Sequence, residues 1–234
     1  MNYILEGLML ISLGGLIVAF QNDLVLWPIL LKAAASAFFV LAGIYGVCRK
    51  KGSRKVSGMM LGALLCSFVG DVLLALDKEE GILFVLGVVS FAAAHILFSL
   101  AFCSISGVRK MDVVAAVLVF AGLMPMLFVG NFDFQGLLPV LIGYAVIISF
   151  MMVKALSLWR CRQGRKRFVC LVMMGGVLFL ASDILLLFWL FGIGVPKEVQ
   201  SINWILYYLA QGCLSSSLNE EDISSERVTE YGNH

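Results

Sequence analysis

Four ionisable side chains lie well inside long apolar stretches of this 234-residue sequence: Lys32, Asp71, His95 and Asp183. A charged group in the hydrocarbon core of a membrane costs about 2.5–3.5 kcal/mol on insertion scales, so such residues usually face the interior of a helix bundle and serve a function. Two carboxyl groups accompany one lysine here. Because two carboxylates in a low-dielectric pocket are not easily ionised together, we expect one to pair with Lys32 and the other to hold a proton.

A protonated acid beside an anionic partner is the arrangement that acid–base chemistry or a proton relay requires. The candidate catalytic residues are therefore Asp71, Asp183 and His95. The alternative is structural: a Lys32–aspartate ion pair and the hydrogen bonds of the other polar groups would only hold the bundle together.

Helical spacing places further polar residues on shared faces. Asn203, Tyr207 and Gln211 recur at i, i+4 and i+8 and form one polar stripe. Gly175 and Gly176 precede Asp183 by about two turns, where small residues let neighbouring helices approach closely. Glu6 and Lys154 lie near segment ends, and we expect their charged groups to reach toward the membrane surface.

Metal and covalent chemistry have little support. The second histidine, His234, ends the chain, so a three-histidine zinc site is impossible within one chain. His95 with the two aspartates could hold a metal, but we predict none. The six cysteines show no CxxC spacing and are expected to be small apolar packing residues. There is no GxSxG, Cys/His or Walker-type motif.

The elements that carry these residues are apolar segments long enough to cross a membrane. The sequence is 61% hydrophobic and 14% charged, whereas soluble domains carry about 25% charged residues. The net charge of +2 gives no reason to expect a nucleic-acid partner. We predict an all-α polytopic membrane protein with eight transmembrane helices, in one domain over residues 1–218, followed by a disordered polar tail over 219–234. The expected spans are 3–20, 24–48, 56–76, 81–105, 112–130, 136–159, 168–191 and 198–218.

Lysine and arginine predict the orientation. They concentrate in the loops after the second, fourth and sixth spans, while the opposite loops carry only Lys78 and Lys197. By the positive-inside rule both termini should be cytoplasmic. We expect a bacterial cytoplasmic membrane.

An internal repeat is expected at an offset of 112 residues. This offset aligns Asp71 with Asp183, His95 with Tyr207, and Lys32 with Tyr144. Four spans per unit is an even number, so the halves, about 1–110 and 111–218, would run parallel.

Two blocks of the sequence resemble the YhhN family, whose members include the mammalian lysoplasmalogenases. The first is LGALLCSFVGDVLLAL followed by FAAAHILFSLAF, and the second is GGVLFLASDILLLF followed by INWILYYLAQGCL. The chain departs from many relatives at Ala33, where proline is frequent, and at Phe98, where tyrosine is frequent. Neither departure removes an ionisable group.

The resemblance implies hydrolysis of the vinyl ether bond of lysoplasmalogens to a fatty aldehyde and glycerophosphoethanolamine or glycerophosphocholine, without a cofactor. Asp71 and Asp183 would supply the acid and the anion or base, as two carboxylates do around a glycosyl cation, and His95 would assist proton transfer. The residues expected to orient the carboxylates or bind substrate are Lys32, Tyr144, Asn203, Tyr207, Tyr208 and Gln211. The expected partners are a lysophospholipid from the bilayer, membrane lipids and a second copy of the chain in a homodimer.

Two other functions fit the same residues. Parallel repeats with ionisable residues near the midplane also occur in transporters, and a proton-holding aspartate suits proton coupling. A lipid-binding membrane protein without catalysis is the third possibility.

Overall fold

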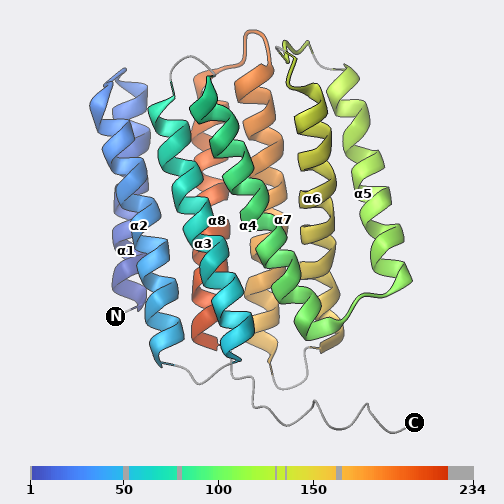
Figure 1. The fold of residues 1–234 in the computed structure, drawn as a ribbon. Helices are drawn as coiled ribbons and strands as arrows, with labels where there is room; N and C mark the ends of the chain where they lie inside the picture. The colour runs from blue at the N-terminus through green and yellow to red at the C-terminus, as the bar shows by residue number, and fades with distance from the viewer. Residues whose placement is uncertain are drawn as a thin grey trace, which may run out of the picture.

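The computed structural model is an up-and-down bundle of long helices (Figure 1) and describes residues 2–49, 53–77, 81–129, 131–134, 136–161 and 165–220. The helices within these ranges are α1 (Asn2–Gln21), α2 (Leu26–Arg49), α3 (Arg54–Leu76), α4 (Ile82–Ser106), α5 (Lys110–Val129), α6 (Leu138–Ser157), the 3-10 turn η1 (Leu158–Cys161), α7 (Lys166–Phe191) and α8 (Lys197–Glu220). The all-helical prediction is confirmed. The predicted tail lies outside the described residues from position 221 onward.

Seven of these helices, α1 to α7, are long and apolar enough to cross a membrane. The eighth, α8, has 24 residues but is much less apolar. The reason is its polar side chains, most of which are buried within the bundle, including Asn203 and Gln211. The eighth span therefore stays a prediction, carried by the position of α8 among α1, α2, α3 and α7.

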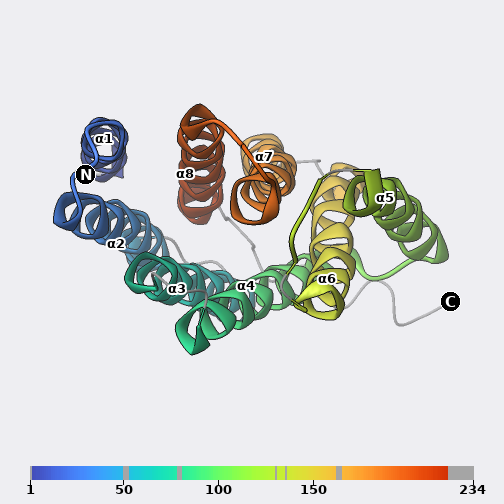
Figure 2. The same ribbon diagram turned by 90° about the horizontal axis from the view of Figure 1, so that it is seen from above.

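Seen along the bundle axis, the helices form two curved rows (Figure 2). One row contains α2, α3, α4 and α6, and the other contains α1, α8, α7 and α5. In the described structure α6 is the only α-helix whose backbone lies close to that of α5, whereas α1 packs against both α2 and α8.

Helix packing follows the 112-residue correspondence. The neighbours α1–α2, α2–α3 and α3–α4 in the first half match α5–α6, α6–α7 and α7–α8 in the second, and the cross-contact α2–α8 matches α6–α4. Two helix contacts have no counterpart: α1 packs on α8 but α5 does not pack on α4, and α3 packs on α8 but the backbones of α7 and α4 do not come equally close. The parallel repeat stays a prediction that this packing supports.

Glycines allow α7 to approach its neighbours closely. A Cβ atom at Gly175 would lie 2.7 Å from the Leu214 side chain of α8, and one at Gly176 would lie 2.7 Å from the Cβ atom of Ala155 in α6. Both distances are well inside van der Waals contact. The prediction of close approach at these glycines is confirmed.

The N-terminal end of α1 lies at the same end of the bundle as the boundaries that carry basic residues, namely the end of α2 at Arg49 and the start of α5 at Lys110 (Figure 1). At the opposite end, the segment before α6 pairs with the end of α7 through an isolated bridge between Phe132 and Gly192.

Lys154 corrects one prediction. Its side chain is fully buried and does not reach toward the membrane surface. Its Nζ donates to Asp112 Oδ2 at 2.9 Å and to the Gly107 carbonyl at 2.5 Å. Arg160 also binds both carboxylate oxygens of Asp112, at 2.8 and 3.0 Å. The sequence concealed this because Asp112 lies 42 residues earlier, on another helix.

Candidate functional site

Asp71 is the centre of the first polar cluster. It lies in α3, five residues before the end of that helix, and its side chain is almost fully buried. Oδ2 accepts hydrogen bonds from Ser36 of α2 at 2.7 Å and from Tyr207 of α8 at 2.5 Å. Lys32 Nζ lies 3.3 Å from Oδ1. The expected lysine–aspartate pair therefore forms with Asp71.

Tyr208 and Gln211 bind the residues that surround Asp71. The Tyr208 hydroxyl donates to the Lys32 carbonyl at 3.1 Å and lies 3.0 Å from the Ser36 hydroxyl. Gln211 Nε2 donates to the Tyr207 hydroxyl at 3.2 Å. Neither Tyr208 nor Gln211 has exposed surface. Each therefore contacts the groups that hold Asp71 and not Asp71 itself.

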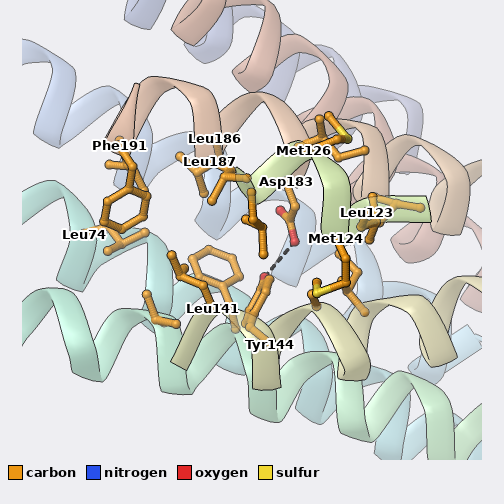
Figure 3. A pocket seen from close by; sticks show the side chains of 18 of the residues that line it. Leu74, Leu123, Met124, Met126, Leu141, Tyr144, Asp183, Leu186, Leu187 and Phe191 are labelled. Carbon is orange, nitrogen blue, oxygen red and sulfur yellow. Dashed lines mark hydrogen bonds between the residues drawn. The ribbon is translucent and has the colours of Figure 1, made fainter. Parts of the chain in front are cut away.

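Asp183 of α7 is the centre of the second cluster. Its Oδ2 accepts a hydrogen bond from the Tyr144 hydroxyl at 2.7 Å (Figure 3). The same oxygen lies 3.3 Å from His95 Nε2. The same His95 nitrogen lies 2.8 Å from the Tyr144 hydroxyl, while Nδ1 is buried without a partner among the described residues. About 11% of the Asp183 side chain is exposed, against 2% for Asp71, so Asp183 is the more accessible carboxyl.

The two clusters have the same layout. Each aspartate binds a side chain from 39 residues earlier in the chain, Lys32 for Asp71 and Tyr144 for Asp183. Each also meets a side chain from the fourth helix of the opposite half, Tyr207 for Asp71 and His95 for Asp183. The layout is shared, but the chemistry differs. The partner from 39 residues earlier is a cation, Lys32, for Asp71 and a phenol, Tyr144, for Asp183.

A small central cavity joins the clusters. Its lining includes both aspartates together with Lys32, Asn203 and Tyr207. Asn203 is fixed there by a 2.6 Å hydrogen bond from Nδ2 to the Ser182 carbonyl. The two carboxyl groups therefore share one space, which a two-carboxylate mechanism needs.

Two larger cavities adjoin the central one, and Leu74 and Leu186 line all three. The apolar cavity, with about 810 Å³ of empty space, lies between α5 and the helices α4, α6 and α7, and reaches Asp183 and Tyr144 (Figure 3). The outer cavity, with about 1130 Å³, is lined by the ends of α1, α3 and α7 and the starts of α2 and α8, with Lys32 in its lining. Empty space thus leads to the aspartates from two sides.

The structure brings the predicted residues together, with one change in depth. His95 follows the start of α4 by 13 residues, so the sequence suggested a deeper position than that of Tyr144, six residues into α6. In the structure His95 Nε2 nevertheless lies 2.8 Å from the Tyr144 hydroxyl, so the two side chains meet. Helical spacing also puts Ser36 one turn after Lys32 on the same polar face, although Ser36 is not among the predicted site residues. Trp204 and the two shared leucines are missing from the predicted set.

Two further predictions concern groups outside these clusters. The Glu6 carboxylate accepts hydrogen bonds from Asn2 of α1 and Ser216 of α8. Besides lying near the end of its helix, Glu6 therefore links α1 to α8. All six cysteines, which lie in the described residues, are free thiols. Among the described residues no group of three or more His, Cys, Asp or Glu side chains is placed to hold a metal ion.

Comparison with known proteins gives one match. Residues 27–218 match the model of the YhhN family, which is most of the chain and includes every residue of both clusters. No curated protein and no solved structure matches the chain.

Proposed function

Because the chain belongs to the YhhN family, we propose that it is a membrane-embedded hydrolase that cleaves the vinyl ether bond of lysoplasmalogens. The observation that carries the proposal is the central cavity, where Asp71 and Asp183 meet between an apolar cavity and an outer cavity. A lysoplasmalogen has three parts in the same order: an apolar chain, a vinyl ether bond and a polar head group.

In the proposed complex, the alkenyl chain occupies the apolar cavity. Among the described α-helices only α6 has its backbone close to that of α5, so the chain enters from the bilayer beside α5. The vinyl ether then lies against Asp183, and the head group extends past Lys32 into the outer cavity. We propose that this cavity lies in the leaflet away from the cytoplasm of a bacterial cytoplasmic membrane, because the positive-inside rule favours the opposite end of the bundle as the cytoplasmic end.

The reaction begins with a proton. Asp183 donates it to the outer alkene carbon, and the resulting oxocarbenium ion carries positive charge on the carbon bound to oxygen. Water attacks that carbon while the Asp183 carboxylate takes a proton from the water, giving a hemiacetal. The hemiacetal carbon–oxygen bond to glycerol breaks, its hydroxyl proton passes to the glycerol oxygen, and a fatty aldehyde leaves. Asp183 is again protonated, and the net reaction consumes one water.

The contacts distinguish the two aspartates. Asp71 meets a cation and accepts two hydrogen bonds, and these contacts favour its carboxylate form against the burial that opposes it. It is the fixed negative charge that stabilises the oxocarbenium ion. Asp183 forms no ion pair with a lysine or arginine of the described residues, is the more accessible carboxyl, and borders both the central and the apolar cavities. Tyr144 and His95 orient it and pass protons to it.

The test uses purified protein in detergent with a lysoplasmalogen in D₂O and immediate trapping of the aldehyde. We expect aldehyde with one deuterium on the carbon next to the carbonyl, because that carbon receives the catalytic proton. The saturated alkyl ether analogue should remain intact. If the vinyl ether is also left intact, the proposal is wrong. Uptake of the lysolipid into liposomes would then identify a carrier, and binding alone a lipid-binding protein.

A further inference from the structure

Three aromatic rings line the outer cavity. Phe20 of α1 meets Trp189 of α7 edge to face, with ring centroids 5.7 Å apart, and meets Trp204 of α8 in the same manner at 5.0 Å. The three side chains come from separate helices and all border the space that leads to Lys32. We refer to Phe20, Trp189 and Trp204 as the aromatic wall.

The aromatic wall differs from the tryptophans that anchor proteins at a membrane surface. Trp204 is only 7% exposed, and it borders both the outer and the central cavities. Trp27 lies near the same end of the bundle, is 57% exposed, and borders none of the three cavities. Trp27 fits the anchoring role, whereas the aromatic wall lines the outer cavity.

The charges around the outer cavity suit a ligand cation against the aromatic wall and a ligand anion near Lys32, where the outer cavity meets the central one. Lys197 Nζ already lies 5.9 Å from the Phe20 ring centroid and is paired with Asp23. Asp77 contributes a carboxylate to the lining, and Lys32 is the cation nearest the central cavity. A phosphate toward Lys32 and an ammonium group toward the wall and Asp77 would match these charges.

Hydrogen bonding distinguishes two kinds of ammonium group. The three N–H groups of an ethanolamine ammonium lose their hydrogen bonds to water on entering the cavity and need other acceptors in exchange. A trimethylammonium group has no N–H group and needs none. The Asp77 oxygens already accept the backbone N–H groups of Gly81 and Phe84 at the start of α4. The Gln200 side-chain oxygen has no hydrogen-bond partner among the described residues, but it is buried too deeply for a head group in the cavity to reach. Aromatic faces, by contrast, are the usual partners of quaternary ammonium ions.

We propose that the aromatic wall binds the trimethylammonium group of a choline head group, so that this protein selects choline lysolipids over ethanolamine lysolipids. The proposal rests on the proposed function for the orientation of the lipid. It concerns recognition and not cleavage, so binding of a non-cleavable lipid tests it separately.

The test measures dissociation constants of three saturated alkyl ether lysolipids, with choline, ethanolamine and glycerol head groups, by displacement of a radiolabelled choline form. We expect the choline form to bind most tightly to the wild-type protein. Trp189→Leu should weaken that binding about tenfold, the size of a desolvated cation–π contact, and leave the glycerol form unchanged. Trp189→Phe, which keeps an aromatic face, should retain most of the affinity, and the control Trp27→Leu all of it.

Equal binding of the three head groups would overturn the proposal, as would a Trp189→Leu variant that keeps the choline preference or a wild-type protein that binds no lysolipid. If choline selectivity and its dependence on Trp189 are found but vinyl ether lipids are never cleaved, the head-group site stands and the hydrolase proposal fails. If cleavage occurs without head-group preference, the hydrolase proposal stands and the head-group site fails.

Discussion

Asp71 and Asp183 occupy matching positions in two halves of the chain, yet their partners differ. Lys32 lies 3.3 Å from one, and Tyr144 donates to the other at 2.7 Å. In our proposal, this one difference in partner separates a carboxylate that stays charged from a carboxyl that exchanges protons. The distinction needed the structure, because helical spacing shows which residues share a face but not which aspartate receives the lysine.

The first prediction tests the Lys32–Asp71 pair. Lys32→Met leaves a buried carboxylate without its cation, and loss of one partner of a buried pair costs about 3–5 kcal/mol. We expect a clearly lower thermal unfolding temperature in detergent. The double variant Lys32→Met/Asp71→Asn removes both charges and should regain much of that stability while remaining inactive. A double variant as unstable as the single one would contradict the pairing.

At the scale of helices, the bundle depends on contacts that close spacing makes possible. Gly176 lets α7 approach Ala155, whose Cβ atom is fixed to the α6 backbone and has no rotamer to change. The charged group formed by Asp112, Lys154 and Arg160 fixes the start of α5 to α6 and η1. The sequence predicted the glycine contacts, because small residues on a span are a local signal. It misplaced Lys154, because burial of a lysine near the end of a helix depends on partners that lie far away in the sequence.

The second prediction concerns Gly176. Gly176→Ala adds a Cβ atom 2.7 Å from that of Ala155, so the two helices must separate. We expect a loss of stability of about 1–3 kcal/mol, as for overpacked cores, seen as a lower unfolding temperature. The matched control is Gly14→Ala in α1, where an added Cβ atom meets nothing within 4 Å. Equal effects of the two substitutions would contradict the packing.

The third prediction concerns the Asp112 cluster. Asp112→Asn leaves the fully buried Lys154 without its carboxylate, with an expected loss of about 3–5 kcal/mol. Limited proteolysis should then cut between α4 and α5 faster than in the wild type. Asp112→Asn/Lys154→Met should reverse much of the thermal destabilisation. No change in the single variant would mean that Lys154 is not buried against Asp112.

At the scale of the whole molecule, the halves depart from their common layout at α5. Since α5 does not contact α4, an apolar space remains there and reaches Asp183. The sequence predicted the helices, their order and the polar residues that meet, because apolar length and helical spacing are encoded locally. It could not predict the cavities, which depend on how far one helix stands from another.

The fourth prediction follows from the apolar cavity. Met124→Trp on α5 would fill space expected to hold the end of a long alkenyl chain. We expect the KM for a long-chain lysoplasmalogen to rise about tenfold, roughly the value of two buried methylenes, with little change for a short-chain one. Leu118→Trp is the control, because Leu118 lies on α5 and is 67% exposed. Equal effects on both chain lengths would place the chain elsewhere.

The most direct test of the central claim compares aldehyde release by the wild type, Asp71→Asn and Asp183→Asn, each shown to be folded by its unfolding transition. Asparagine keeps the shape of each side chain but can neither donate the acid proton nor carry the negative charge. We predict that each substitution lowers kcat by about a thousandfold or more, as expected for loss of acid–base and electrostatic stabilisation. Full activity in either variant would contradict the claim that two buried aspartates act together on one bond.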